Sequence, residues 1–380
     1  MVSSNVDALG IIFPNSYDAT VPELVTERLM ASIPFASRYR MIDFVLSGMV
    51  NAGIDNISVI VRKNYHSLMD HLGSGRAWDL SRKNGGLNIV PPFAEKAVKV
   101  YHGRVEALAS ILTFLRDQKE KYVIMADTNV AANYDFKEVI SQHIATNADV
   151  TVIYTKWEAS AEALSTNVEQ GDMYYTLNLQ DGRVTDIHIN PKEEGIQNLS
   201  MNIYVVNREL LIRQIEDAYI KGYPFYERDV LIPQVKDLNI QGYEYTGYLA
   251  LITSLKSYCH ENMRLLDEKN ADALFSGNHI YTKVRDDNPS RYTSDAKVKN
   301  VMAADGCIIE GEVENCVLFR GVKIKKGAVD KNSILMQDTV VEPGAHVEYV
   351  ITDKNVTISS GKDVKGAMSY PFYVAKHKTV

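Results

Sequence analysis

The sequence predicts an α/β protein in which a doubly wound, mostly parallel sheet is followed by a β-helix. Over the first two thirds of the chain, short apolar runs alternate with stretches whose apolar residues recur at helical spacing, as in a parallel sheet covered by helices. From about Asn288 the helical spacing stops, and small and β-branched residues recur every six positions, which is typical of hexapeptide β-helices. A chain of 380 residues is long enough for two such domains.

The expected elements follow one another in a regular order. Strands are predicted at 8–13, 56–61, 122–127 and 149–154, and helices at 41–54, 106–118, 136–147 and, before the junction, 258–275. Ligands of doubly wound sheets bind beyond the carboxyl ends of the strands. A site is therefore expected around residues 14–16, 62–65 and 127–128.

The repeat in the last third has a strict step of six. It passes through Val322, Ala328, Ile334 and Val340, and a second column passes through Val329, Leu335, Val341 and Val347. A sandwich of short strands is the alternative, but its turns usually lie farther apart and less regularly. We expect an α/β domain at residues 1–285 and a β-helix domain at residues 286–380.

Composition excludes several classes of protein. The chain is 46% hydrophobic and 23% charged, as in ordinary globular proteins. Its net charge of −7 offers no basic footprint for nucleic acid, and no apolar run has membrane length. The start lacks the pattern of a signal peptide, and the three cysteines lack metal-ligand spacing. We expect a cytoplasmic protein with reduced thiols.

Several stretches together carry a family resemblance. In chain order they are YRMIDFVLSGMVNAGI, YHSLMDHLGSGRAWDL, NIVPPF, YHGRVEAL, YVIMAD, SMNIYVVN and SYCHENMRLL, followed by the hexapeptide tail. The chain resembles glucose-1-phosphate adenylyltransferases over nearly its whole length. The resemblance implies a nucleotide-sugar transferase (Rossmann-like) domain followed by a left-handed β-helix. The family reaction joins glucose 1-phosphate to the α-phosphate of ATP and releases pyrophosphate, which requires amides and cations on the phosphates and a metal held by carboxylates.

Against this family pattern, the parts that hold phosphate are missing. The glycine-rich loop of the family, G-G-x-G-T-R-L, aligns with NSYDATV, where Asn15, Ser16 and Asp18 replace the three glycines. Thr20 replaces the arginine of the loop, and Met30 replaces the lysine of the family segment R-A-K-P-A. We expect Asp18 to be a solvated loop carboxylate rather than a changed ligand.

The sugar-phosphate and metal positions differ from the family pattern as well. The family segment F-V-E-K-P reads IHINP, so Ile189 and Asn190 replace the glutamate and lysine that hold glucose 1-phosphate, and Asn202 replaces the glycine of S-M-G-I-Y. Asp127 matches the first metal carboxylate, and we interpret it as a vestige of a metal site rather than a simple loop cap. The second carboxylate position is Leu251, which cannot bind Mg²⁺ because that ion requires oxygen ligands.

These losses within a preserved scaffold predict a regulatory, non-catalytic subunit. The family includes bacterial enzymes with two related subunits, one catalytic and one regulatory. The resemblance implies a role in glycogen biosynthesis, no cofactor for this chain, Mg²⁺ for a catalytic partner, and a hetero-oligomer, by analogy a tetramer. Two alternatives stay open: an active sugar-phosphate nucleotidyltransferase with unusual ligands, such as Asp135 as second carboxylate, and a stand-alone sensor of sugar phosphates or nucleotides.

Basic residues near the expected ligand edge are candidates for binding an anionic effector, either a sugar phosphate or a nucleotide. They are Arg28, Arg38, Arg40, Arg62 and Lys63. The alternative for each is an ordinary solvated charge. The aromatic stretch YPFYER, at 223–228, is expected to lie in the core or in an interface.

Overall fold

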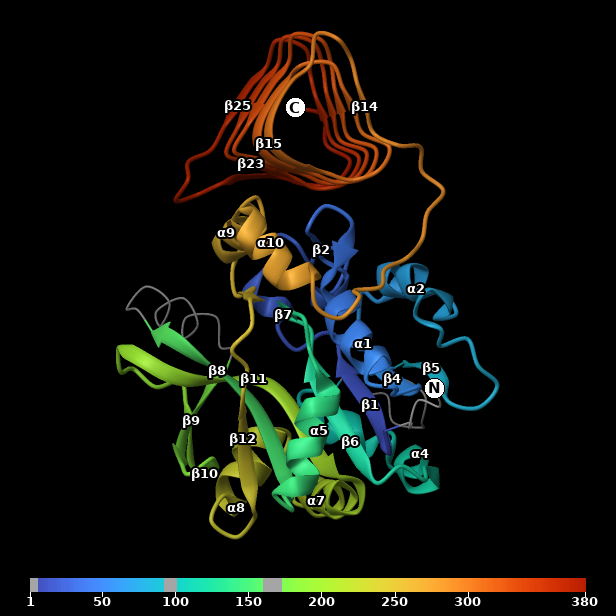
Figure 1. Ribbon diagram of the computed structural model, residues 1–380, viewed down its shortest axis with the longest axis vertical. Coiled ribbons are helices and arrows are strands. Elements are labelled where there is room, and N and C mark those ends of the chain that lie inside the picture. The colour runs from blue at the N-terminus through green and yellow to red at the C-terminus, as the bar shows by residue number, and fades with distance from the viewer. Residues whose placement is uncertain (1–5, 92–100, 160–172) are drawn as a thin grey trace.

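The computed structural model describes residues 6–91, 101–159 and 173–380. Figure 1 shows two parts. One is an α/β part built on a large sheet, and the other is a triangular coil of stacked strands that lies across one side of the α/β part. In the described residues, no helix is both long enough and apolar enough to cross a membrane.

The α/β part is built on a nine-stranded sheet. In sheet order its strands are β5 (Gly86–Val90), β4 (Asn56–Ile60), β1 (Ala8–Phe13), β6 (Tyr122–Asp127), β11 (Gly195–Asn207), β8 (Val150–Ala159), β12 (Ile240–Glu244), β10 (Arg183–Ile189) and β9 (Tyr175–Gln180). The four strands from β5 to β6 are parallel, as the alternation of strands and helices predicts. β11 runs antiparallel between β6 and β8, so the remainder of the sheet is mixed.

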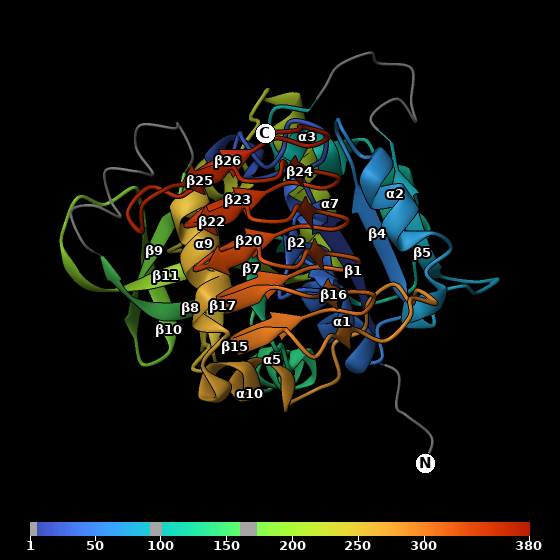
Figure 2. The same cartoon turned by 90° about the horizontal axis from the view of Figure 1, so that it is seen from above.

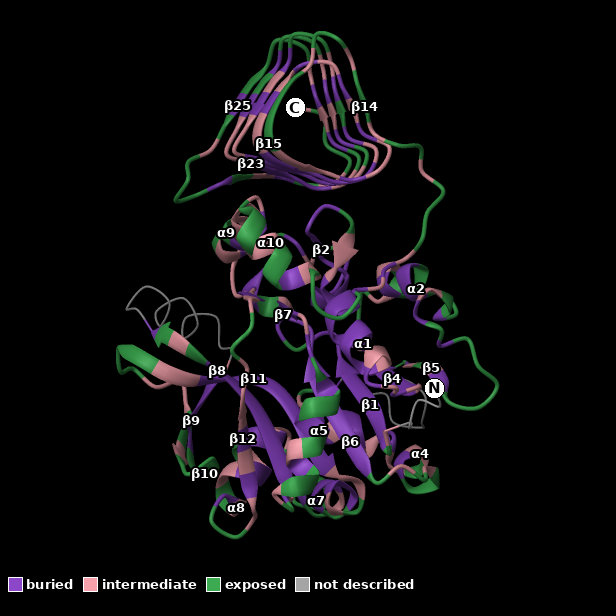
Figure 3. Cartoon of the chain, in the orientation of Figure 1, coloured by how far each residue is buried: buried purple, intermediate pink, exposed green. Residues whose placement is uncertain are grey.

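Helices cover both faces of this sheet, and others lie between it and the coil of stacked strands (Figure 1). They are α1 (Met41–Asn51), α2 (His66–Leu72), α3 (Arg104–Ala109), α4 (Leu112–Asp117), α5 (Phe136–Ala145), α7 (Arg208–Ile220), α8 (Ile232–Gln234), α9 (Leu255–Arg264) and α10 (Glu268–Phe275). One apolar cluster joins the sheet to α1 and α5, and a second joins it to α3, α4 and α7. Figure 3 shows the strands between these layers as buried.

Two predicted helices are each divided into two. The helix expected at 106–118 breaks between α3 and α4, where the hydroxyl of Ser110 donates to the carbonyl of Ala107. Such a local bond competes with the helical pattern. The helix expected at 258–275 ends before Asp267, whose carboxylate accepts from the amide of Lys269 and so starts α10.

The last part is a left-handed β-helix, as predicted. Its strands are β14 (Arg291–Tyr292), β15 (Lys297–Ala303), β16 (Ile308–Ile309), β17 (Glu312–Leu318), β18 (Lys323–Ile324), β19 (Val329–Lys331), β20 (Ile334–Leu335), β21 (Val340–Val341), β22 (His346–Glu348), β23 (Val350–Thr352), β24 (Thr357–Ile358), β25 (Asp363–Lys365) and β26 (Phe372–Val374). Lys323, Val340 and Thr357 share one register, so a turn there takes 17 residues and contains about three hexapeptides. Figure 2 shows the turns stacked from β15 to β26.

The β-helix shares a hydrophobic core with the α/β part. Phe319, Met336 and Ile351 of the β-helix belong to the same buried cluster as Phe35 and Tyr258 of the α/β part. Seen from above, the β-helix strands lie across α9 and β2 (Pro34–Phe35) (Figure 2). β2 pairs with β3 (Tyr39–Arg40). The two parts are therefore fixed against each other by apolar packing.

One buried residue departs from the apolar pattern of the β-helix. Asp330 lies in register with Val313 on one side and with Val347 on the other, and Val364 continues the same column. The side chain of Asp330 is fully buried. Burial raises the pKa of its carboxyl to about 7, and neither carboxyl oxygen has a hydrogen-bond partner among the described residues.

We predict that Asp330→Val stabilises the protein. In the unfolded chain this carboxyl ionises above about pH 4, but in the fold it stays protonated up to about pH 7. Stability of the wild type should therefore fall between pH 4 and 7, and the variant should lack that loss. We expect a gain of about 1–4 kcal/mol in the free energy of unfolding at pH 8, measured with urea. Asp363→Val, at an exposed position of β25, is the control and should change stability little; equal stability of Asp330→Val and wild type at pH 8 would contradict the prediction.

Candidate functional site

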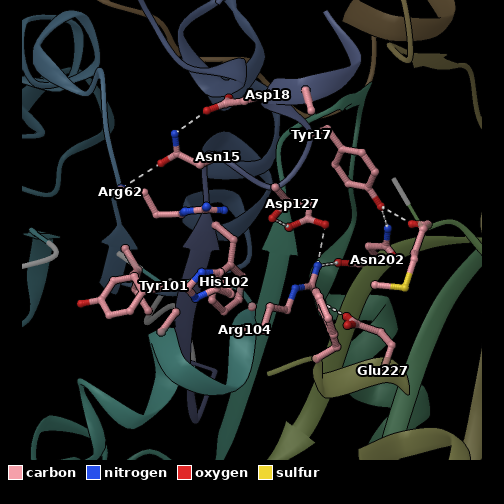
Figure 4. A pocket seen from close by; sticks show the side chains of 18 of the residues that line it. Asn15, Tyr17, Asp18, Arg62, Tyr101, His102, Arg104, Asp127, Asn202 and Glu227 are labelled. Carbon is pink, nitrogen blue, oxygen red and sulfur yellow. Dashed lines mark hydrogen bonds and ion pairs between the residues drawn. The ribbon is translucent and has the colours of Figure 1, made fainter. Parts of the chain in front are cut away.

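A cavity of about 530 Å³ lies where the sequence predicted a site, beyond the carboxyl ends of β1, β4 and β6 (Figure 4). Phe13, Ile60 and Asp127 contribute its floor from these strands. Most of its wall comes from the glycine-free loop at 15–19 and from residues 101–104, which lead into α3. Four further segments contribute Arg62 and Lys63, Met173 and Tyr175, Asn202, and Phe225 with Glu227.

The glycine-free loop is held by its own side chains. One oxygen of Asp18 accepts from the backbone amide of Met30 and the other from the side chain of Asn15, both at 2.7 Å. Asn15 in turn accepts from the backbone amide of Arg62 at 2.9 Å. The prediction of a solvated Asp18 is therefore wrong: the residue is partly buried, which raises its pKa, and it fixes the shape of the loop.

The loop also uses amides that a phosphate would need. The amide of Asp18 donates to the carbonyl of Asn15, and the amide of Thr20 donates to the carbonyl of Tyr17, within the short 3-10 helix η1 (Asp18–Thr20). A phosphate-binding loop leaves such amides unpaired and directed at the ligand. In the described loop, the amides of Asp18 and Thr20 instead bond to carbonyls of the loop itself.

Tyr17 divides the cleft into two cavities. Its buried ring lines both the 530 Å³ cavity and a second cavity of about 40 Å³. Its hydroxyl accepts a hydrogen bond from the side chain of Asn202, which stands at a backbone φ of +53° where the family has glycine (Figure 4). Leu251 lines the smaller cavity and Asp127 the larger one. The two positions that would share a metal thus lie on opposite sides of Tyr17.

A buried group of three charges forms one side of the larger cavity. Arg104 donates to Asp127 at 2.6 Å, to the carboxylate of Glu227, and to the carbonyl of Asn202 at 3.2 Å. The side chains of Arg104, Asp127 and Glu227 are only 8%, 2% and 9% exposed, so solvent screens these ion pairs little. Burial disfavours the charge of Arg104, but the two carboxylates raise its pKa above the ordinary value. Ser16 completes the group by donating to Asp127 at 2.6 Å.

Comparison with known proteins decides the family. The nucleotidyl transferase model matches residues 24–232, more than half of the chain. The chain belongs to the nucleotidyl transferase family. A second model, that of the GlmU-like C-terminal hexapeptide, matches residues 284–367 and agrees with the observed β-helix.

Individual relatives show which members of this family the chain is similar to. The glycogen biosynthesis protein GlgD of Bacillus subtilis is 32% identical over 98% of this chain and 96% of its own length. A GlgD of Geobacillus stearothermophilus is 38% identical over 86% of this chain and 83% of its own. The glucose-1-phosphate adenylyltransferase of Geobacillus stearothermophilus is 31% identical over 85% of this chain and 83% of its own. The resemblance to the glucose-1-phosphate adenylyltransferase family is confirmed, and the chain is related to proteins of glycogen synthesis.

The other positions at which this nucleotidyl transferase family member departs from the pattern have structural contacts. Met30 is buried in the core, and the hydroxyl of Thr20 donates to the carbonyl of Tyr17 at 2.8 Å. Asn190 accepts from the amide of Tyr174 at 2.8 Å. Leu251 packs beside the small apolar cluster that includes Leu199. None of these four side chains lines the 530 Å³ cavity as the structure describes it.

The structure separates the five basic candidates into three places. Arg62 and Lys63 line the 530 Å³ cavity. Arg38 and Arg40 line a different cavity of about 460 Å³, between the α/β part and the β-helix. Arg28 lines neither: it is buried and its guanidinium contacts Asp353 at 2.6 Å. Arg28 therefore serves the contact between the two parts.

The cavity between the two parts, here called the cationic pocket, collects charges from distant segments. Seven lysine and arginine residues line it: Arg38, Arg40, Lys283, Arg285, Arg320, Lys354 and Lys376. Among its described lining residues, Asp70 supplies the one carboxylate. Burial, and then repulsion by Arg40 and Arg28, lower the pKa of Lys354 to about 7. Such mutual repulsion is relieved when an anion binds.

Sequence reasoning missed several of the charged and polar groups that line the larger cavity and the cationic pocket. Arg104 stands inside the stretch YHGRVEAL, and Glu227 inside YPFYER, which was expected in the core or in an interface; Glu227 is buried and lines the larger cavity. Two signals were available in the sequence: Arg104 is a charged residue just before a predicted helix, and Glu227 is a charged residue within an aromatic run. Tyr17 and Lys354 gave no signal in the local sequence.

We predict that Arg28→Ala lowers the free energy of unfolding by about 3–5 kcal/mol, because it leaves Asp353 buried without its partner. Glu27→Ala is a matched control: Glu27 and Lys376 bridge the same two parts at 2.8 Å, but their side chains are 54% and 29% exposed. That exposed pair should contribute no more than about 1 kcal/mol. Urea unfolding of both variants measures the difference. A loss in Arg28→Ala no larger than in Glu27→Ala would contradict the assigned role.

Proposed function

We propose that this chain is a regulatory, non-catalytic subunit of glucose-1-phosphate adenylyltransferase in glycogen biosynthesis. The observation that carries the proposal is a cleft in which the loop at 15–19 and the carboxylate of Asp127 bond to groups of the protein itself while the surrounding fold is intact. Similarity to both GlgD proteins and glucose-1-phosphate adenylyltransferases supports it. A cytoplasmic hetero-oligomer, by family analogy a tetramer, is part of the proposal.

The state of the cleft argues against catalysis by this chain alone. Nucleotidyl transfer depends on groups that are preorganised for the developing charge of the phosphates. Here the side chains of Asn15 and Asp18 bond to each other within the loop, and Tyr17 separates the cleft into two cavities. Asp127 is ion-paired with Arg104. A properly held metal alone is worth several kcal/mol, and about 1.4 kcal/mol changes a rate tenfold.

The structure disfavours the alternative of an active enzyme that uses Asp135 as its second carboxylate. Asp135 caps the start of α5, accepting from the amides of Lys137 and Glu138 at 3.1 and 3.3 Å. It lines neither of the two cleft cavities as described. A stand-alone sensor remains the rival class, and the experiment below distinguishes it.

We further propose that the cationic pocket receives a phosphorylated effector. Arg38 and Arg40 come from the α/β part, whereas Arg320 and Lys354 come from the β-helix. An anion bound among them contacts both parts of the molecule at once and so can bias their relative arrangement. Couplings of this kind typically amount to about 1–3 kcal/mol, or roughly 5–150-fold in affinity.

The regulatory role predicts a specific result when this chain is titrated into a fixed amount of a catalytic paralogue that carries the glycine-rich loop. The two proteins should co-elute, and the maximal rate, substrate affinity or effector response should shift. The chain alone should synthesise no measurable ADP-glucose. Leu251→Asp is the control and should not restore activity, because phosphate and sugar contacts are still missing. Separate elution with unchanged kinetics would overturn the regulatory role and favour a stand-alone sensor.

The cationic pocket predicts anion binding that weakens as the pH rises. Sulfate is the probe because its charge is constant between pH 6 and 8. Lys354 faces Arg40, Arg28, Lys376 and the carboxylate of Asp353, and it is charged below about pH 7. Affinity for sulfate should therefore fall up to about tenfold from pH 6 to pH 8.

The predicted pH dependence is tested by calorimetric titration of sulfate into the wild type, Lys354→Gln and Arg62→Gln. Lys354→Gln should bind sulfate more weakly and without the pH dependence. Arg62→Gln changes the other cavity and should keep the pH dependence of the wild type. A pH profile that Lys354→Gln leaves unchanged would contradict the assignment.

A further inference from the structure

The charges at the floor of the cleft balance one another inside the protein. Arg104 lies between the carboxylates of Asp127 and Glu227 and contacts both (Figure 4). Its guanidinium also lies 5.0 Å from the ring centre of Phe13 and 5.3 Å from that of Tyr204. Aromatic faces favour a cation in such positions. The site is therefore built around a positive charge.

The backbone is arranged to bring this cation into place. Gly103 precedes α3, and a Cβ atom there would lie 2.0 Å from the carbonyl oxygen of Pro224. The amide of Val105 donates to the same carbonyl at 3.1 Å. Only glycine permits this close approach. The contact holds the start of α3 against the segment that leads into the π-helix η4 (Glu227–Leu231), so Arg104 and Glu227 meet although 123 positions separate them.

The family resemblance implies a divalent metal at Asp127, but the residues present do not fit one. One oxygen of Asp127 accepts from Ser16 and the other from Arg104. The second family position, Leu251, offers no oxygen and lies beyond Tyr17 in the smaller cavity. Within residues 6–91, 101–159 and 173–380, no group of three or more acidic, histidine or cysteine side chains is arranged to hold a metal ion.

We propose that the guanidinium of Arg104 is a built-in replacement for the divalent cation of this cleft. Arg104 is a permanent counter-ion for Asp127 and Glu227, and the chain binds neither Mg²⁺ nor Mn²⁺ between them. Because the cation is covalently attached, the cleft keeps its structure at any concentration of free metal. This assignment goes beyond the proposed function and holds whether or not the chain regulates a partner.

Removal of Arg104 should convert the cleft into a metal site. In Arg104→Ala the two carboxylates face each other without a cation, which lowers the melting temperature. Added Mn²⁺ should then bind with a stoichiometry of about one and raise the melting temperature of the variant by at least about 3 °C at saturation. Bound Mn²⁺ is counted from the loss of the free-ion EPR signal. Arg104→Gln, which fills more of the same volume, is the second variant in case Arg104→Ala does not fold.

Two controls make the result specific. Arg104→Ala/Asp127→Asn should lose the gained Mn²⁺ site. Arg62→Ala, which lines the same cavity but has no place in the charged group, should gain none. Wild type and Asp127→Asn should respond alike to Mn²⁺.

Either of two results would overturn the proposal. The first is a stoichiometric Mn²⁺ site that wild type has and Asp127→Asn lacks. The second is a folded Arg104→Ala or Arg104→Gln protein that binds no Mn²⁺. The wild-type comparison decides the matter even if neither Arg104 variant folds. Neither measurement uses catalytic activity or a partner, so failure here is separate from failure of the regulatory role.

Discussion

The buried guanidinium of Arg104 is the contact on which the structure of the cleft depends. It joins the end of β6, through Asp127, to η4, through Glu227, and its bond to the carbonyl of Asn202 adds β11. Without a cation, two buried carboxylates would lie uncompensated, which is strongly unfavourable. Contacts within the chain therefore hold in place the strand ends that surround the cleft.

Several donors at the loop and the floor of the cleft form hydrogen bonds within the protein. Catalysis requires donors that point at empty space until a substrate arrives. Here the same kind of donors bond within the protein: the amide of Met30 to Asp18, the hydroxyl of Ser16 to Asp127, and the side chain of Asn202 to Tyr17. Each such bond stabilises the fold and removes a ligand contact, which is the usual opposition between stability and activity.

The segment that anchors the glycine-free loop also reaches the β-helix. Met30 bonds to the loop, Arg28 is ion-paired with Asp353 of the β-helix, and Arg38 and Arg40 line the cationic pocket. The residue after Asp353 is Lys354, which lines that pocket as well. One short stretch of the α/β part is thus in contact with the cleft, the domain junction and the cluster of cations. The cationic pocket therefore adjoins the ion pair that joins the two parts.

The sequence by itself determined the fold class, because strand, helix and hexapeptide patterns are set by neighbouring residues. It located β1 and β6 at their observed bounds, and it identified the glycine-free loop and Leu251 as departures from the family. Only the tertiary structure decided what these departures do. Arg104 meets Glu227 across 123 positions, and Arg28 meets Asp353 across 325. Ion pairs of this kind depend on how distant segments pack, and local periodicity carries no information about them.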